Sequence, residues 1–127
     1  MNTQQQIVAL LSNLDPDISD KRIAVHVHDR VKLININLVA YIVADDSYCK
    51  IKLVTNETYT IAKLLKDFEE MLFDNTDFVR IHKSCMLNVK HIKEYTKGDP
   101  CIIEMKDGKQ FEVSRRKKQE VLEKLKK

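Results

Sequence analysis

From Arg22 onward, apolar and polar residues alternate in short runs, and this period of two limits the folds open to the chain. Ile23, Val25 and Val27 fall on one side of an extended segment, and residues 47–54 repeat the pattern. Such alternation is typical of strands with one buried face. The sequence therefore predicts a mostly β fold of short strands with few helices.

The last strand pair is predicted from its turn. Residues 106–108 read Lys-Asp-Gly, and a two-residue Asp-Gly turn would mix apolar and polar residues on each face. A three-residue loop instead pairs Ile103 with Phe111 and Cys101 with Val113, and it puts the glycine at the left-handed position that such loops prefer. We predict the three-residue loop.

Another hairpin is predicted where Asp45 and Asp46 separate the apolar run 38–44 from the alternating run 47–54. Adjacent aspartates are ordinary turn formers, and no neighbouring group would separate their pKa values. The sequence therefore predicts no acid–base site at this tip.

Residues 61–73 have the period of a helix, with apolar residues at intervals of three and four. Thr60 can cap its first turn. The wide apolar face predicts a helix buried against the sheets. Its apolar positions are Ile61, Leu64, Leu65, Phe68, Met71 and Leu72.

A shorter amphipathic helix is predicted over residues 4–14, ending before Pro16. We expect residues 1–21 to form this helix and a linker, and residues 22–127 to form one domain. The helix either packs on its own domain or contacts a second copy or a partner protein. Its apolar stripe is Ile7, Leu10, Leu11 and Leu14.

Charge is divided unevenly along the chain. Residues 1–79 carry 8 Lys or Arg against 12 Asp or Glu, a net charge of −4, whereas residues 80–127 carry 14 against 7, a net charge of +7. A one-sided basic region favours a polyanionic partner, although a charge run is also compatible with a solvated face.

Composition argues against several other classes of protein. The three cysteines have no metal or redox spacing, no run reaches the ~18 apolar residues of a membrane span, and there is no secretory leader. His26 and His28 lack further ligands, so we expect them to be exposed strand residues and predict no metal site. The cysteine pattern and the lack of a leader or span predict a cytoplasmic protein. With only two glycines and no nucleophile–base pair, we predict a protein that is not an enzyme and needs no cofactor.

The stretch FVRIHKSCMLNV, residues 78–89, places polar side chains in a short turn between two apolar runs. Arg80 and Lys83 carry fixed positive charge, while His82 and Ser84 can donate hydrogen bonds to a phosphate oxygen. From this stretch alone, an anion-binding turn and a solvated loop remain open.

A second basic cluster opens the C-terminal helix, whose apolar stripe is Val121, Leu122 and Leu125 and whose N-cap is expected at Ser114. The residues that follow, 115–118, read RRKK. Cations at a helix N-terminus oppose the macrodipole by about 0.3–1 kcal/mol each. This unfavourable local choice favours an external anion, since departures from local rules cluster at functional sites.

The hairpin with a tyrosine near its tip, the buried helix, FVRIHKS followed by CMLNV, the strand pair with Asp-Gly and the closing VSRR together resemble the LytTR DNA-binding domain of bacterial response regulators. The resemblance covers about residues 22–126. It implies small antiparallel sheets stacked in an elongated β sandwich with one buried amphipathic helix and a C-terminal helix. It also implies loops that enter successive major grooves of double-stranded DNA at paired direct repeats in promoters.

Carried over by position, the resemblance implies base contacts from Tyr48, Lys83 and Arg116. Arg116 can bind guanine O6 and N7 with two hydrogen bonds, and Lys83 replaces the arginine often found in that turn. Asn88 is expected to hold the turn through side-chain to backbone bonds, with Ser114 as the other supporting residue. The expected phosphate contacts are Arg80, His82, Ser84, Arg115, Lys50 and Lys93.

Besides Lys83, the chain departs from the family in a second respect. Only about twenty residues precede the resemblance, where a phosphate-receiving domain is usual. We expect either a stand-alone regulator or the excised output domain of a response regulator. The competing hypothesis is an adaptor or anti-regulator that docks an acidic protein through the basic surface.

Overall fold

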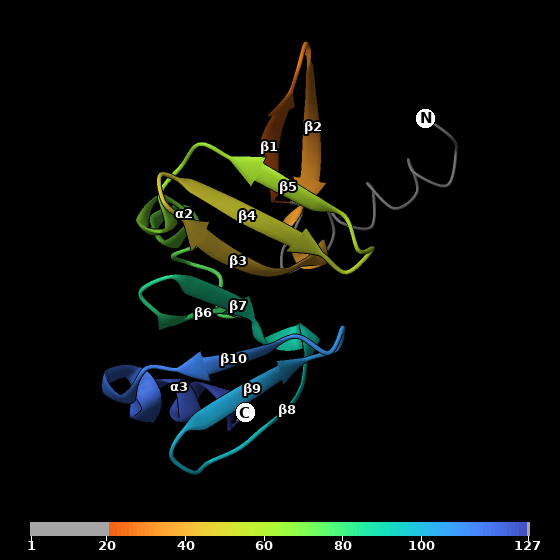
Figure 1. Cartoon of the computed structure of the whole chain (residues 1–127). Helices are drawn as coiled ribbons and strands as arrows, with labels where there is room; N and C mark the ends of the chain where they lie inside the picture. The colour runs from red at the N-terminus through yellow and green to blue at the C-terminus, as the bar shows by residue number, and fades with distance from the viewer. Residues whose placement is uncertain (1–20, 127) are drawn as a thin grey trace. The chain divides into compact units, whose positions relative to one another are not determined.

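The computed structural model describes residues 21–126, so the helix predicted over residues 4–14 lies outside the described residues. The chain divides into two compact units between Asn37 and Leu38. Each unit is built mainly from antiparallel strands, as the alternating pattern predicts (Figure 1).

The first unit contains one hairpin, formed by β1 (Arg22–Val27) and β2 (Arg30–Asn35). Ile23 and Val25 are buried, which confirms the predicted apolar side of this strand. His26 and His28 are exposed, but His28 lies in the turn with φ of 58° rather than on the strand.

The second unit contains a five-stranded sheet with the order β5-β4-β3-β7-β6. The predicted hairpin at Asp45 and Asp46 is present, and its two-residue turn places Asp46 at φ of 63°. The strands are β3 (Val39–Asp45), β4 (Tyr48–Leu53), β5 (Thr58–Ile61), β6 (Phe78–His82) and β7 (Cys85–Asn88).

Helix α2 (Leu65–Met71) is shorter than the helix predicted over residues 61–73. The prediction that Thr60 caps it is wrong, because Thr60 lies in β5 and pairs with Lys50 of β4. Pairing with β4 provides backbone hydrogen bonds that the local helical period cannot anticipate. The helix instead begins after Leu64, whose N–H donates to the Asp67 carboxylate at 3.0 Å.

The apolar face of α2 is buried only in part. Leu65, Phe68 and Leu72 are buried, but Leu64 is 46% exposed. The predicted packing of the helix against a sheet is confirmed for the buried residues, whose face lies against β3.

A three-stranded sheet with the order β10-β9-β8 completes the second unit. Its hairpin confirms the predicted three-residue loop, because Phe111 pairs with Ile103 and Val113 pairs with Cys101. Gly108 has φ of +93°, the conformation predicted for it. The strands are β8 (Ile92–Tyr95), β9 (Cys101–Met105) and β10 (Gln110–Val113).

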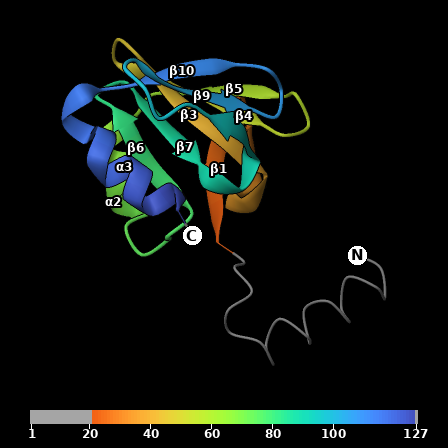
Figure 2. The ribbon, with the colours of Figure 1, turned by 90° about the horizontal axis from the view of Figure 1, so that it is seen from below.

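The C-terminal helix is present as α3 (Lys118–Leu125), which lies beside β6 (Figure 2). Ser114 is an N-cap as predicted, but it caps a 3-10 turn, Arg115–Lys117, and not the first turn of the α-helix. The Lys117 N–H bonds both the carbonyl and the Oγ of Ser114, and this three-residue spacing favours the 3-10 turn.

One core joins both sheets of the second unit to α3. Leu87 and Ile81 come from the five-stranded sheet, Ile103 comes from the three-stranded sheet, and Val121 comes from α3. All four residues are fully buried. A Lys124 Nζ donates to the Phe78 carbonyl at 2.8 Å and ties α3 to the same sheet.

Candidate nucleic-acid interface

Three turns lie together along one edge of the second unit, on the left in Figure 1. They are the β3–β4 turn, the β6–β7 turn and the junction from β10 to α3. The Ala44 N–H donates to the Ser84 carbonyl at 2.8 Å, and the Ser114 N–H donates to the Ile81 carbonyl at 2.9 Å. These two backbone bonds hold the first and third turns to the middle one.

The residues predicted to contact bases occupy these three turns, one in each. Tyr48 starts β4, Lys83 lies between β6 and β7, and Arg116 lies in the 3-10 turn after β10. All three are exposed, and their side chains form no hydrogen bond or ion pair with the described residues 21–126. Their hydrogen-bond donors are therefore available to an external partner.

Arg80 is surrounded differently, because its guanidinium is occupied inside the unit. Its Nη1 lies 2.9 Å from Glu69 Oε1 of α2, its Nε donates to the His82 carbonyl at 3.2 Å, and its Nη2 donates to the Lys83 carbonyl. Its side chain is 20% exposed. Arg80 therefore spans the β6–β7 turn and connects it to α2.

His82 and Ser84 bond to each other on either side of Lys83. The Ser84 N–H donates to His82 Nδ1 at 3.2 Å, and Ser84 Oγ lies 2.9 Å from the same nitrogen. Because Nδ1 accepts from the backbone, the neutral imidazole carries its proton on Nε2. His82 thus retains one N–H donor for another acceptor.

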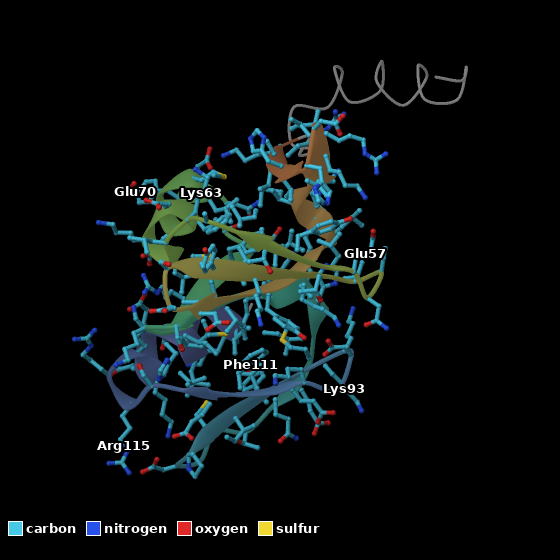
Figure 3. The ribbon with its side chains drawn as sticks, turned by 45° about the horizontal axis from the view of Figure 1, so that its top comes forward. Glu57, Lys63, Glu70, Lys93, Phe111 and Arg115 are labelled. Atoms are coloured by element: carbon cyan, nitrogen blue, oxygen red, sulfur yellow. The ribbon has the colours of Figure 1, made fainter. Side chains whose placement is uncertain are left out.

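The other predicted phosphate contacts lie in different places. Lys50 Nζ is 3.4 Å from Asp45, and Arg115 Nε is 3.6 Å from Asp99, both pairs being well exposed. Lys93 is on β8, and Figure 3 shows it at the opposite side of the view from Arg115. The structure therefore does not bring Lys93 to the three-turn edge.

The two predicted supporting residues both form side-chain to backbone bonds. Asn88 is fully buried, its Nδ2 donates to the Val39 carbonyl at 3.0 Å, and its Oδ1 accepts the Lys90 N–H. These bonds fix the far end of β7 against β3, so Asn88 does not touch the β6–β7 turn. Ser114 does lie at the edge, as the cap described above.

Two cationic residues beside this edge were not among the predicted contacts. Lys52 faces the same side of β4 as Tyr48 and Lys50, and the period of two could have identified it. Lys109 lies just before β10, 5.8 Å from the centre of the Phe111 ring, and it has no comparable local signal. Both residues line a cleft with Lys50 and His82.

The cysteines behave as core residues, as predicted. Cys49, Cys85 and Cys101 are free and buried. Burial raises the pKa of the Cys85 thiol from 9.0 to about 12, so the thiol stays protonated even well above neutral pH. No group of three or more metal-ligating residues was found over residues 21–126.

Over the same residues, no helix has both the length and the apolar character to cross a membrane. The described residues form two antiparallel β units, and the second unit presents three basic or polar turns on one edge.

Small antiparallel sheets with exposed cationic side chains on one edge define a β protein whose edge suits a polyanionic partner. The chain matches the family described as the LytTr DNA-binding domain over residues 29–126, and it belongs to that family. The family is one of DNA-binding domains rather than an enzyme fold, and membership supports DNA binding in transcription regulation.

Two similar proteins agree with this assignment. The Sensory transduction protein LytT of Bacillus subtilis (strain 168) is 29% identical over 96 residues, which cover 74% of this chain and 39% of that protein. The solved LytTr DNA-binding domain of a protein described as a methyl-accepting/DNA response regulator from Bacillus cereus has a TM-score of 0.71 at 22% identity. That match covers 84% of this chain and 98% of the solved one, and it shows the same fold.

Proposed function

We propose that this chain is a sequence-specific transcriptional regulator that inserts the three-turn edge into the major groove of double-stranded DNA. The observation that carries the proposal is the pair of backbone bonds from Ala44 to Ser84 and from Ser114 to Ile81. They fix three separate turns on one edge, so three exposed side chains can contact one duplex together. Paired direct repeats in promoters are the proposed target.

Within this edge, Tyr48, Lys83 and Arg116 are the proposed base contacts. The planar guanidinium of Arg116 can donate two hydrogen bonds to guanine, which gives it the strongest preference for one base. Lys83 presents a single ammonium and discriminates less. The Tyr48 hydroxyl can hydrogen-bond a base edge, and its ring can pack against a thymine methyl group.

The proposed phosphate contacts are His82 through Nε2–H, Ser84, Arg115 and Lys50. Arg80 is assigned a positioning role because its guanidinium already bonds Glu69 and two carbonyls of the β6–β7 turn. It contributes positive potential while holding the Lys83 backbone in place. Lys93 is left out of the proposed interface because it lies away from the edge.

Selection from a pool of random duplexes with the full chain tests the proposal. We expect enrichment of one motif, because fixed base contacts favour particular base pairs. The proposed paired direct repeats predict that this motif occurs twice in the same orientation. Lys66→Ala is the matched control, since Lys66 is an exposed cation on α2 that is absent from the edge. Enrichment of no motif would overturn sequence-specific binding, and a stoichiometric complex with an acidic protein instead would favour the adaptor hypothesis.

A further inference from the structure

A cleft of about 710 Å³ opens between β3–β4 and β10, within the second unit. Its volume lies in the range of small-molecule sites, roughly 300–1,000 Å³. Tyr41, Val43 and Phe111 supply apolar walls, and Figure 3 shows Phe111 in the middle of the unit. The Phe111 ring is held edge-on against Tyr41, with the ring centres 4.8 Å apart, so this wall is preorganised.

Cations converge on the same cleft. Lys50, Lys52 and Lys109 line it, and Glu112 is the one carboxylate among the described lining residues. Lys52 is partly buried and forms no ion pair or hydrogen bond with the residues that the structure describes. Lys50 is already paired with Asp45 at 3.4 Å, so Lys52 and Lys109 are the two cleft lysines without an ion pair to the described residues, and they concentrate positive potential there. A bound anion would offset that potential.

We propose that this cleft binds a small anion that carries a planar apolar ring. The lysines would neutralise the anionic group, and the ring would lie against Val43 and Phe111. An inorganic ion alone would leave most of the cleft unfilled, and an uncharged ring would leave Lys52 and Lys109 uncompensated. The ligand class is therefore an aromatic phosphate or carboxylate of about nucleotide size.

The cleft is continuous with the three-turn edge, because His82, Ser84 and Ser114 line it as well. A ligand bound there would contact residues of the β6–β7 turn and of the junction from β10 to α3, and would change how these residues can contact DNA. By linkage, the ligand and DNA must alter each other's affinity by the same factor. This coupling rests on the proposed function, whereas binding of the ligand does not.

Binding is tested by titrating the full chain with 1-naphthyl phosphate and following backbone and methyl signals by NMR. We expect saturable one-to-one binding, with the largest changes at Val43, Lys52 and Phe111. Inorganic phosphate and 1-naphthol serve as the anion alone and the ring alone, and each should bind at least about tenfold more weakly. Equal binding of 1-naphthol would overturn the anionic character of the site.

Two variants locate the site. Lys52→Met and Lys109→Met keep the length of the side chain, remove one charge each, and should raise the Kd about fivefold to tenfold. Lys66→Met removes the same charge from α2, outside the cleft, and should leave the Kd unchanged. An unchanged NMR fingerprint away from the cleft shows that each variant is folded. No saturable binding, or equal binding by all three variants, would overturn the proposal.

A DNA titration separates this proposal from the proposed function. If 1-naphthyl phosphate binds in the cleft, saturating it should change the Kd for the selected duplex. If wild-type protein does not bind 1-naphthyl phosphate while Lys52→Met weakens all duplexes alike, the lysines serve DNA phosphates and the ligand site is overturned. If 1-naphthyl phosphate binds in the cleft but the wild-type chain selects no duplex, the ligand site stands and the proposed function fails.

Discussion

Arg80 and Arg116 are arginines near the same edge, but their surroundings give them different roles. The Arg80 guanidinium bonds Glu69 and the carbonyls of His82 and Lys83. The Arg116 side chain is exposed and forms no hydrogen bond or ion pair with the described residues. A sequence contains no direct sign of this difference, because both residues are cations next to strands. Only the fold determines which arginine is available to a partner.

Arg116→Ala should cost about 1–3 kcal/mol of discrimination at one base pair, because it removes the two proposed hydrogen bonds to guanine. Competition between the selected duplex and single-base variants measures this loss. Arg116→Lys keeps the charge without the planar donor pair and should lose most of the same discrimination. Retention of the full base preference by either variant would contradict the proposed contact.

Glu69→Ala tests the positioning role of Arg80. Removing an acid should strengthen DNA binding if Glu69 acts only through its charge. If Glu69 positions the turn through Arg80, the ratio of specific to non-specific affinity should instead fall, by about 2- to 5-fold for a partly exposed pair. Binding to the selected and scrambled duplexes gives this ratio. Glu70→Ala, which removes a neighbouring exposed acid, is the matched control.

Alkaline pH should destabilise the protein through Cys85. Burial raises its folded pKa to about 12 from an ordinary value of 9.0, so the folded state keeps the proton while the unfolded state loses it. Unfolded chains then bind fewer protons, and the free energy of unfolding falls as pH rises above about 9. Urea unfolding at several pH values measures the fall. Cys85→Ala should show a shallower decline, and an equal decline would contradict the assignment.

At the scale of elements, the hairpins were predictable and one helix boundary was not. The pairing of Ile103 with Phe111 follows from the alternation on each side of a short loop, which is local information. The start of α2 depends on Thr60 pairing with Lys50, ten residues earlier in the chain. Local helical period competes there with hydrogen bonds that only the assembled sheet supplies.

The loop between β9 and β10 depends on its glycine. Gly108 has φ of +93°, which an alanine adopts only with strain, so Gly108→Ala should cost about 1 kcal/mol or more of stability. Nothing lies within 4 Å of an added Cβ, so this cost comes from the backbone and not from a steric clash. Gly98 has equal space and no positive φ, so Gly98→Ala should have little effect. Urea unfolding of both variants measures the difference. Equal stability of the two variants would contradict a requirement for the left-handed conformation.

At the scale of the whole molecule, the candidate interface is only partly visible in the sequence. The charge division indicated the C-terminal part, yet Lys93 belongs to that part and lies away from the edge. Lys50 and Tyr48 come from the part with net negative charge and lie at or beside the edge. The net charge of a chain segment therefore does not predict which of its charged residues the fold brings to one face.

The salt dependence of DNA binding reports on the complete interface. Of the proposed phosphate contacts, Lys50 and Arg115 carry a positive charge. Further cations at or beside the same edge are Lys52, Lys83, Lys109 and Arg116. If roughly 4–6 phosphates are neutralised, the log of the binding constant should fall with the log of salt concentration at a slope of about −4 to −5. Fluorescence anisotropy between low and physiological salt measures this slope. A slope near zero would contradict binding through this edge.

The bonds that hold the three turns together join backbone atoms, from Ala44 to Ser84 and from Ser114 to Ile81. A main-chain amide and carbonyl are present whatever side chain the residue carries. Exchanging Tyr48, Lys83 or Arg116 for other residues therefore leaves those bonds intact. If these side chains read bases as proposed, the same scaffold can acquire a different DNA preference by a few substitutions, without a new fold.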